Sequence, residues 1–278
     1  MSKVILVTGA SCGFGQIIAA QLAARGHRVF GTSRRALPDQ GQVRMLVLDV
    51  TDDAQVSNAL AQVIEEAGRI DVLINNAGVG LCGAVEDTSL AEAQWQMDTN
   101  FFGPLRMIHA ALPHMRNQGS GRIINIGSLA GMAGMPFQPF YSASKYAIEG
   151  LNEALRLELT GSGIQATTIN PGDFKTGFTD ARVFSAQARD GHNTQRLNST
   201  VAIYERDEQQ GADGDLGPPG TEGALEGDRG LDDREDQDAQ ERSDDRAIAP
   251  AQQGAAHHHR RDGIQLHAGS ADRISGGG

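Results

Sequence analysis

The sequence predicts an α/β fold in which a doubly wound parallel sheet of six to seven strands carries helices on both faces. Short apolar runs rich in β-branched residues alternate with stretches of helical periodicity along the first two hundred residues. These runs are apolar throughout, as strands buried on both faces are. With 278 residues and 39% hydrophobic content, the chain can furnish the core that one such domain needs.

The elements follow one another in a repeating order. Residues 4–9 form an apolar run that stops at glycine, and residues 17–26 continue at helical spacing, which predicts a strand, a turn and a helix. Further strands are predicted at residues 28–33, 44–50, 71–78, 122–128 and 164–172. Further helices are predicted at residues 53–67, at 90–116 with a break near Pro104, and at 141–160.

The composition changes after residue 206. Residues 207–278 hold 17 acidic and 7 basic side chains, so this stretch carries −10 of the net charge of −11. Residues 205–278 contain no Phe, Tyr or Trp, and such a segment buries too little apolar surface to offset its ordering entropy. We therefore expect one domain, residues 1–206, and a disordered acidic tail of low complexity, residues 207–278. Two origins of the tail stay open, a natural extension and a frameshift near residues 211–220.

Charge and cysteine content argue against several classes of function. The body of the chain is nearly neutral and has no basic cluster, so no nucleic-acid partner is expected. Cys12 and Cys82 have no partner at metal-ligand spacing, so neither a metal site nor a disulfide framework is expected. No apolar run reaches the roughly 18 residues of a membrane span, and the expected location is the cytoplasm.

A glycine-rich segment, TGASCGFG at residues 8–15, joins the first strand to the first helix. Gly9 permits a tight turn, Gly13 lets the backbone approach a pyrophosphate, and Gly15 lets the helix pack closely on the sheet. Amide groups and the helix dipole make the start of such a helix an anion site. The segment indicates a dinucleotide site, with an ordinary glycine turn as the structural alternative.

A tyrosine and a lysine lie four residues apart on the helix predicted at residues 141–160. Tyr141 and Lys145 therefore share one helix face. The unperturbed pKa of tyrosine is about 10, so a nearby ammonium that lowers it would let the phenol act as acid or base near neutral pH. Taken alone, the pair would also fit an ordinary helix surface.

Taken in order, these motifs resemble those of the classical short-chain dehydrogenase/reductase family over residues 1 to about 206. The glycine segment has the family's TGxxxGxG spacing, and the other matching motifs are Asp49 with Val50, NNAG at 75–78, Asn100, Ser128, YSASK at 141–145 and NPG at 170–172. The sequence looks closest to hydroxysteroid and retinol dehydrogenase-like members. The resemblance implies a Rossmann-like fold and an oxidoreductase acting on CH–OH groups, which transfers a hydride between a nicotinamide cofactor and an alcohol, ketone or aldehyde.

The resemblance also implies a role for each motif residue. Ser128 would hydrogen-bond the substrate oxygen, Tyr141 would transfer its proton, Lys145 would hold the nicotinamide ribose, and Asn100 would anchor a water of the proton relay. The implied cofactor-binding set is Thr8, Gly9, Ser11, Gly13, Phe14, Gly15, Arg34, Asp49, Val50, Asn76, Ala77, Gly78, Tyr141, Lys145, Pro171, Gly172 and Thr176. The structural alternatives are a satisfied polar residue at a helix kink for Asn100 and a helix cap for Thr176.

The end of the second predicted strand favours one form of the cofactor. Arg34 and Arg35 follow this strand, where an NAD-specific site usually places a carboxylate that accepts hydrogen bonds from the ribose 2′-hydroxyl. A guanidinium can instead pair with a 2′-phosphate. NADP(H) is therefore the expected cofactor and NAD(H) stays open, with solvated loop charges as the alternative.

Two segments are candidates for the substrate wall, MAGMPFQPF at residues 132–140 and DFKTGFTDARVF at residues 173–184. Both are rich in apolar and aromatic residues, which indicates a hydrophobic substrate. The alternative function is a non-catalytic NADP(H)-binding protein or an inactive truncated relative. The family resemblance further implies a homodimer or homotetramer, built through residues 100–118 and 141–160.

Overall fold

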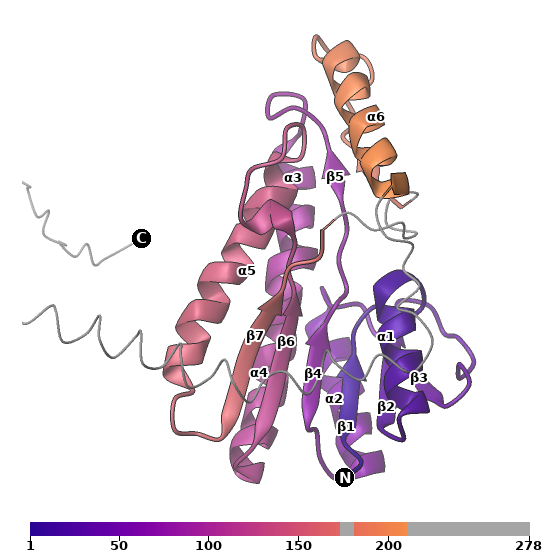
Figure 1. Cartoon of the computed structure of the whole chain (residues 1–278), viewed down its shortest axis with the longest axis vertical. Coiled ribbons are helices and arrows are strands. Elements are labelled where there is room, and N and C mark those ends of the chain that lie inside the picture. The colour runs from indigo at the N-terminus through magenta and orange to yellow at the C-terminus, as the bar shows by residue number, and fades with distance from the viewer. Residues whose placement is uncertain (173–180, 211–278) are drawn as a thin grey trace, which may run out of the picture. The chain divides into compact units, whose positions relative to one another are not determined.

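The computed structural model describes residues 1–172 and 181–210 of the chain (Figure 1). The chain divides into two units, Met1–Leu216 and Gly217–Gly278, and the fold below belongs to the first. Thr176 lies outside the described residues, as does the predicted tail beyond residue 210. The last described helix, α6 (Thr194–Gln210), continues four residues past the expected domain end at residue 206.

A six-stranded parallel sheet forms the centre of the first unit, and this confirms the predicted fold class. The strand order is β3-β2-β1-β4-β6-β7, and every neighbouring pair is parallel. The strands are β1 (Val4–Val7), β2 (Arg28–Ser33), β3 (Val43–Val47), β4 (Val72–Asn75), β6 (Gly121–Ile126) and β7 (Ile164–Ile169). The chain order reverses at β1, which lies between β2 and β4. Doubly wound folds bind their ligands beyond the carboxyl ends of the strands at such a reversal.

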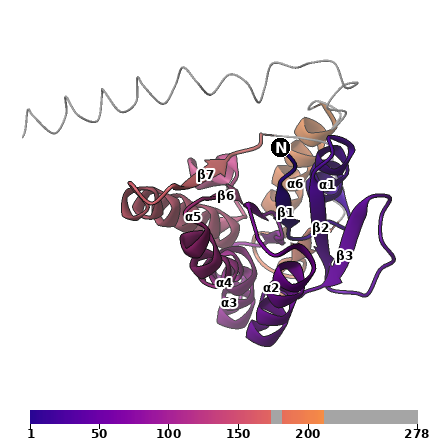
Figure 2. The ribbon, with the colours of Figure 1, turned by 90° about the horizontal axis from the view of Figure 1, so that it is seen from below.

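Helices cover both faces of the sheet (Figure 2). They are α1 (Gly13–Ala24), α2 (Asp53–Ala67), α3 (Leu90–Met97), α4 (Gly103–Gln118) and α5 (Pro139–Glu158), besides α6. The first apolar core joins α2, α4 and α5 to one face of the sheet. The second core joins α1 to the other face through Ala19 and Ala23, whose small side chains let the helix lie close to the strands.

The long helix predicted at residues 90–116 is broken, as expected, close to Pro104. The break is a turn of π-helix, η1 (Asp98–Phe102), between α3 and α4. Pro104 stands in the first turn of α4, where its missing N–H costs no helical hydrogen bond. Single π-helical turns inside helices are frequent at functional sites, and this one contains Asn100.

Shorter elements complete the unit above the sheet. A 3-10 turn, η2 (Leu129–Gly131), lies shortly after β6. The two-residue strands β5 (Leu81–Cys82) and β8 (Val183–Phe184) pair in parallel and form a small second sheet. They bring the chain after residue 180 next to the chain after β4, although about a hundred residues separate the two segments.

Candidate active site

A pocket of about 360 Å³ opens beyond the carboxyl ends of the strands. Thirteen of the predicted site residues line it, namely Gly9, Ser11, Gly13, Phe14, Arg34, Asn76, Ala77, Gly78, Ser128, Tyr141, Lys145, Pro171 and Gly172. Of the other predicted residues that the structure describes, none lines this pocket: Thr8, Gly15, Asp49, Val50 and Asn100 lie elsewhere. The topology therefore gathers the glycine loop and the Tyr141 and Lys145 pair around one cavity.

The glycine loop packs too tightly for side chains at two of its three glycines. A Cβ on Gly9, whose φ is +66°, would lie 2.9 Å from the Cα of Ala77. A Cβ on Gly15 would lie 2.3 Å from the carbonyl oxygen of Gly9. Gly13 has a φ of +56° and open space where a Cβ would be. The loop thus presents bare backbone to the pocket, as a phosphate cradle does.

Side chains tie this loop to the end of β4. The hydroxyl oxygen of Thr8 accepts from the amides of Asn76 and Ala77, each at 3.0 Å. The side-chain amide of Asn76 donates to the carbonyls of Thr8 at 2.9 Å and Gly9 at 3.1 Å. Thr8 itself does not line the pocket, but its hydrogen bonds fix the position of residues that do.

The start of α1 differs from the start of α2. Asp52 caps α2 by accepting from the amides of Ala54 and Gln55, at 2.9 and 3.0 Å. At the start of α1, Cys12 makes no side-chain capping bond, and the residues there line the pocket. The first amides of α1, together with the positive end of its dipole, suit a pyrophosphate at this position. The residues present therefore fit a dinucleotide cofactor.

The residues that follow the second and third strands, which were predicted to bear on cofactor binding, separate into two groups. Arg34 lines the pocket with an exposed side chain, whereas Arg35 does not line it. The carboxylate of Asp49 accepts from both the amide and the hydroxyl of Thr51, at 3.0 and 2.7 Å. Val50 is buried in the core on the α2 side of the sheet. Of these four residues, only Arg34 lines the pocket.

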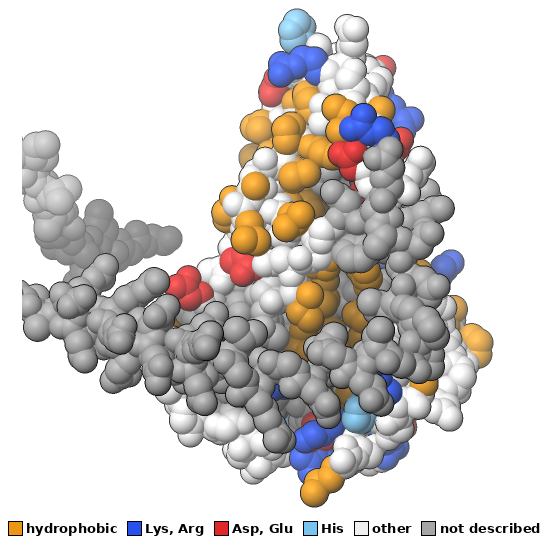
Figure 3. Space-filling view, viewed as in Figure 1, with side chains coloured by type: hydrophobic (Ala, Val, Ile, Leu, Met, Phe, Trp, Pro, Cys, Tyr) orange, Lys and Arg blue, Asp and Glu red, His pale blue; other side chains and the backbone are white. Residues whose placement is uncertain are grey.

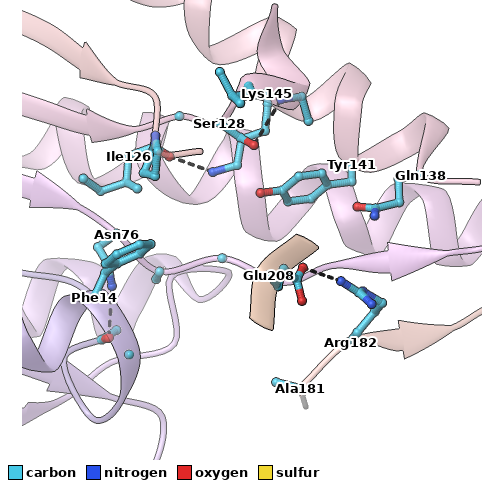
Figure 4. Close-up of a pocket in the computed structure, with 18 of the residues that line it drawn as sticks. Phe14, Asn76, Ile126, Ser128, Gln138, Tyr141, Lys145, Ala181, Arg182 and Glu208 are labelled. Carbon is cyan, nitrogen blue, oxygen red and sulfur yellow. Dashed lines mark hydrogen bonds and ion pairs between the residues drawn. The ribbon is translucent and has the colours of Figure 1, made fainter. Parts of the chain in front are cut away.

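Ser128, Tyr141 and Lys145 meet at the centre of the pocket (Figure 4). Ser128 lies two residues after the end of β6, and its hydroxyl hydrogen-bonds the phenol of Tyr141. The ammonium of Lys145 donates to the carbonyl of Ile126 at 2.6 Å and lies 5.7 Å from the centroid of the Tyr141 ring. The i, i+4 spacing on α5 thus places both side chains in one cavity, as predicted.

Burial controls the protonation of this cluster. Burial raises the pKa of Tyr141, and the hydrogen bond from Ser128 only partly opposes this effect. Burial also lowers the pKa of Lys145 to about 8, against the attraction of Glu149. The sequence predicts a phenol whose pKa the ammonium lowers. The structure corrects that expectation, because desolvation penalises both charged forms and keeps Tyr141 protonated at neutral pH.

Asn100 does not line the pocket but connects two segments that carry site residues. Its side chain donates to the carbonyl of Val79 at 2.9 Å and to the hydroxyl of Ser144 at 3.2 Å, and it accepts from the amide of Val79 at 2.9 Å. Ser144 in turn donates to the carbonyl of Tyr141 at 2.7 Å. The buried amide therefore joins the chain after β4 to the first turn of α5. Its role as the anchor of a catalytic water stays a prediction.

Four polar residues that sequence reasoning did not single out line the far end of the pocket, namely Gln138, Arg182, Tyr204 and Glu208. Gln138 and Arg182 belong to the two segments predicted as a hydrophobic wall, whereas Glu208 belongs to the predicted tail. The substrate end is thus more polar than those segments suggest. Within the described residues, no group of His, Cys, Asp and Glu is placed to hold a metal ion.

Helix α6 brings two of these residues to the pocket. Leu197 and Val201 are buried against Cys82 and Ala188, and the hydroxyl of Tyr204 donates to the carbonyl of Pro136 at 2.9 Å. The residues Leu197, Val201, Tyr204 and Glu208 recur at intervals of four, three and four. That spacing marks one face of a helix and is the signal that could have predicted this part of the site.

Comparisons with known proteins agree with this arrangement. Residues 3–185 match the sequence profile of a family described as short chain dehydrogenase. The chain is 49% identical over 212 residues to a 3-ketodihydrosphingosine reductase of Bacteroides thetaiotaomicron, which covers 75% of this chain and 78% of that protein. It is 38% identical over 193 residues to the human 17-beta-hydroxysteroid dehydrogenase type 1, which covers 64% and 58%. The predicted resemblance to hydroxysteroid dehydrogenase-like members is confirmed.

Solved structures show the same fold with either cofactor. A short chain dehydrogenase/reductase from Burkholderia phymatum in complex with NAD matches with a TM-score of 0.67 and 27% identity, over 76% of this chain and 80% of that one. ElxO with NADP bound matches with a TM-score of 0.61 and 26% identity, over 74% and 90%. A nicotinamide cofactor is therefore supported by both structures.

Proposed function

The chain belongs to the short-chain dehydrogenase/reductase family, and on that premise we propose that it reduces a long-chain ketone of the 3-ketodihydrosphingosine type with NADPH. The observation that carries the proposal is the geometry of one pocket, in which the phenol of Tyr141 hydrogen-bonds Ser128 and lies beside the ammonium of Lys145. A protonated phenol is ready to give a proton to a carbonyl oxygen. The relative that is 49% identical supports the ketone class.

When bound, NADPH supplies the hydride that forms the new C–H bond at the carbonyl carbon. The electron pair of the C=O π bond then moves to oxygen, and Tyr141 gives its phenolic proton to that oxygen. Ser128 donates its single hydroxyl proton in a hydrogen bond to the same oxygen, so it stabilises charge where charge develops. A proton from solvent restores Tyr141, and the product is the secondary alcohol.

The cofactor preference is part of the same proposal. The glycine loop and the uncapped start of α1 would hold the pyrophosphate, and Lys145 would hold the nicotinamide ribose. Arg34 would pair with the 2′-phosphate of NADPH, because it lines the pocket after β2 and no carboxylate stands directly at the end of that strand. The preference therefore rests on one guanidinium at the pocket edge.

The test measures NADPH and NADH oxidation by the purified chain against three carbonyl compounds. These are a long-chain 2-amino ketone, a steroid ketone and the aldehyde retinal. We expect the long-chain ketone with NADPH to give the highest kcat/KM. Retinal or a steroid as the best substrate would replace the proposed substrate class, and oxidation of NADPH with none of them would overturn the proposed activity.

We also propose that the chain self-associates through α4 and α5. Three large side chains near these helices are exposed, Phe102 at 45%, Tyr146 at 46% and Leu157 at 74%. Figure 3 shows hydrophobic side chains gathered on the face where α5 lies. Light scattering that gives only monomer at micromolar concentration would contradict the association.

No helix in residues 1–172 or 181–210 is long and apolar enough to cross a membrane.

A further inference from the structure

A buried ion pair lines the pocket beside the residues that transfer the proton. Arg182 Nη2 lies 2.7 Å from Glu208 Oε1, and the two side chains are 3% and 16% exposed. Both line the pocket together with Tyr141 (Figure 4). Neither the proton transfer nor the cofactor contacts described above use this pair. Arg182 stands directly before β8, and Glu208 lies on α6.

One hydrogen-bond donor of this ion pair has no acceptor within the described part of the protein. Arg182 Nη1 is buried and has no hydrogen-bond partner. A buried guanidinium N–H without an acceptor costs free energy, and an ion pair kept only to hold α6 in place gains nothing from leaving it so. Well-packed apolar residues would hold the helix at least as firmly. Arg182 lines the ligand pocket, and we take its unused donor to indicate an acceptor on the ligand.

The charges of the pair restrict the chemistry of that ligand. A hydrocarbon ketone offers nothing to either charge, and an anionic ligand would meet Arg182 but be repelled by Glu208. A carboxylate has about four acceptor positions, so Glu208 can accept from a donor on the ligand in addition to its partners within the protein. A head group that carries both an ammonium and a hydroxyl next to the carbonyl satisfies both residues.

We propose that Arg182 and Glu208 form the head-group subsite for a long-chain 2-amino-1-hydroxy ketone. Glu208 accepts from the ammonium, and Arg182 Nη1 donates to the hydroxyl oxygen. The subsite deepens the proposed function and rests on it. It holds the carbons next to the carbonyl, so it sets which ketone reaches Tyr141 without taking part in the proton transfer.

The experiment compares two ketones of equal chain length, one with the 2-amino group and one without it. Wild-type protein should reduce the amino ketone with the higher kcat/KM. Glu208→Gln should lower kcat/KM for the amino ketone by about 10- to 100-fold, the range expected for a hydrogen bond to a charged group. The same variant should change kcat/KM for the des-amino ketone by less than about threefold.

The matched control is Glu205→Gln, since Glu205 is an exposed carboxylate on the same helix and does not line the pocket. A second readout is the binding of the long-chain amino alcohol product, measured by calorimetry, which should weaken in Glu208→Gln and persist in the control. Equal losses on both ketones would show that the pair only holds α6, and would overturn the subsite. Equal wild-type rates on both ketones would overturn it too while leaving the reductase activity standing. Failure to reduce any ketone would overturn the activity itself.

Discussion

The cofactor end and the substrate end of the pocket are formed by different kinds of segment. At the cofactor end, the glycine loop lines the cavity with Gly9 and residues 11–14, and hydrogen bonds of Thr8 and Asn76 tie this loop to the end of β4. At the substrate end, side chains face the cavity, and they come from α5, from the chain before β8 and from α6. A backbone cradle fits the part of the ligand that every family member shares. A side-chain wall can differ from one member to the next.

Lys145→Met should have a large effect at both ends of the pocket. The substitution removes the ammonium that donates to the carbonyl of Ile126 and lies beside Tyr141. We expect kcat for ketone reduction to fall by about 10²- to 10⁴-fold, the usual range for a group that supports proton transfer, and NADPH binding to weaken as well. Steady-state kinetics with fluorescence titration check both. Lys3→Met, at an exposed position, is the control. Activity near the wild-type level would contradict the assignment.

Gly15→Ala tests the cofactor end alone. The added Cβ would lie 2.3 Å from the Gly9 carbonyl oxygen and 2.4 Å from the Asn76 amide nitrogen, so the loop must move. We expect NADPH affinity to drop by roughly 100-fold, equivalent to about 2.7 kcal/mol. Gly150→Ala is the control, because a Cβ there has open space and should stabilise α5 by about 1 kcal/mol. Unchanged affinity in Gly15→Ala would show that the loop does not cradle the cofactor.

Arg34→Ala tests which residue at the cofactor end distinguishes NADPH from NADH, because backbone contacts to the pyrophosphate are the same for both cofactors. NADPH affinity should fall by about 10-fold, as expected for one exposed charge-assisted contact, with NADH affinity nearly unchanged. Arg35→Ala is the matched control, since its neighbour lines the pocket and it does not. Isothermal titration with both cofactors checks this. Equal losses for NADPH and NADH would contradict a contact with the 2′-phosphate.

A smaller effect concerns stability. The pKa of Lys145 is lowered to about 8 in the folded protein, so burial of its charge destabilises the fold below that pH. Between pH 8 and about 10.5 the unfolded chain binds more protons than the folded one, and the penalty fades as pH rises. Lys145→Met should therefore gain roughly 1 kcal/mol at pH 7, after allowing for the lost bond to Ile126, and less at pH 10. Urea unfolding at both pH values measures this, and a loss of stability at pH 7 would refute it.

What could be predicted from the sequence follows the same division between the two ends. The six strands, the glycine loop, Ser128 and the Tyr141–Lys145 pair are local patterns, and the structure places them as predicted. The raised pKa of Tyr141 was not predictable, because it depends on burial by the whole pocket. Spacing also could not show that Asp49 turns its carboxylate to Thr51.

The substrate end shows why the rest could not be predicted. Arg182 and Glu208 lie 26 residues apart and carry no motif. Their ion pair exists only because β8 pairs with β5 and because α6 buries Leu197 and Val201. Such contacts depend on tertiary packing, which composition does not encode. A charged residue in an acidic segment is usually solvated, and Glu208 is the exception that packing creates.

The central claim is that Tyr141 delivers the proton to the ketone while other residues hold the cofactor. The most direct measurement compares wild type with Tyr141→Phe in the same preparation, by NADPH titration and by the rate of ketone reduction. The account predicts that kcat falls by about 10³-fold or more and that the dissociation constant for NADPH changes by less than about threefold. A Tyr141→Phe protein that binds NADPH and still reduces the ketone at a rate close to wild type would contradict it.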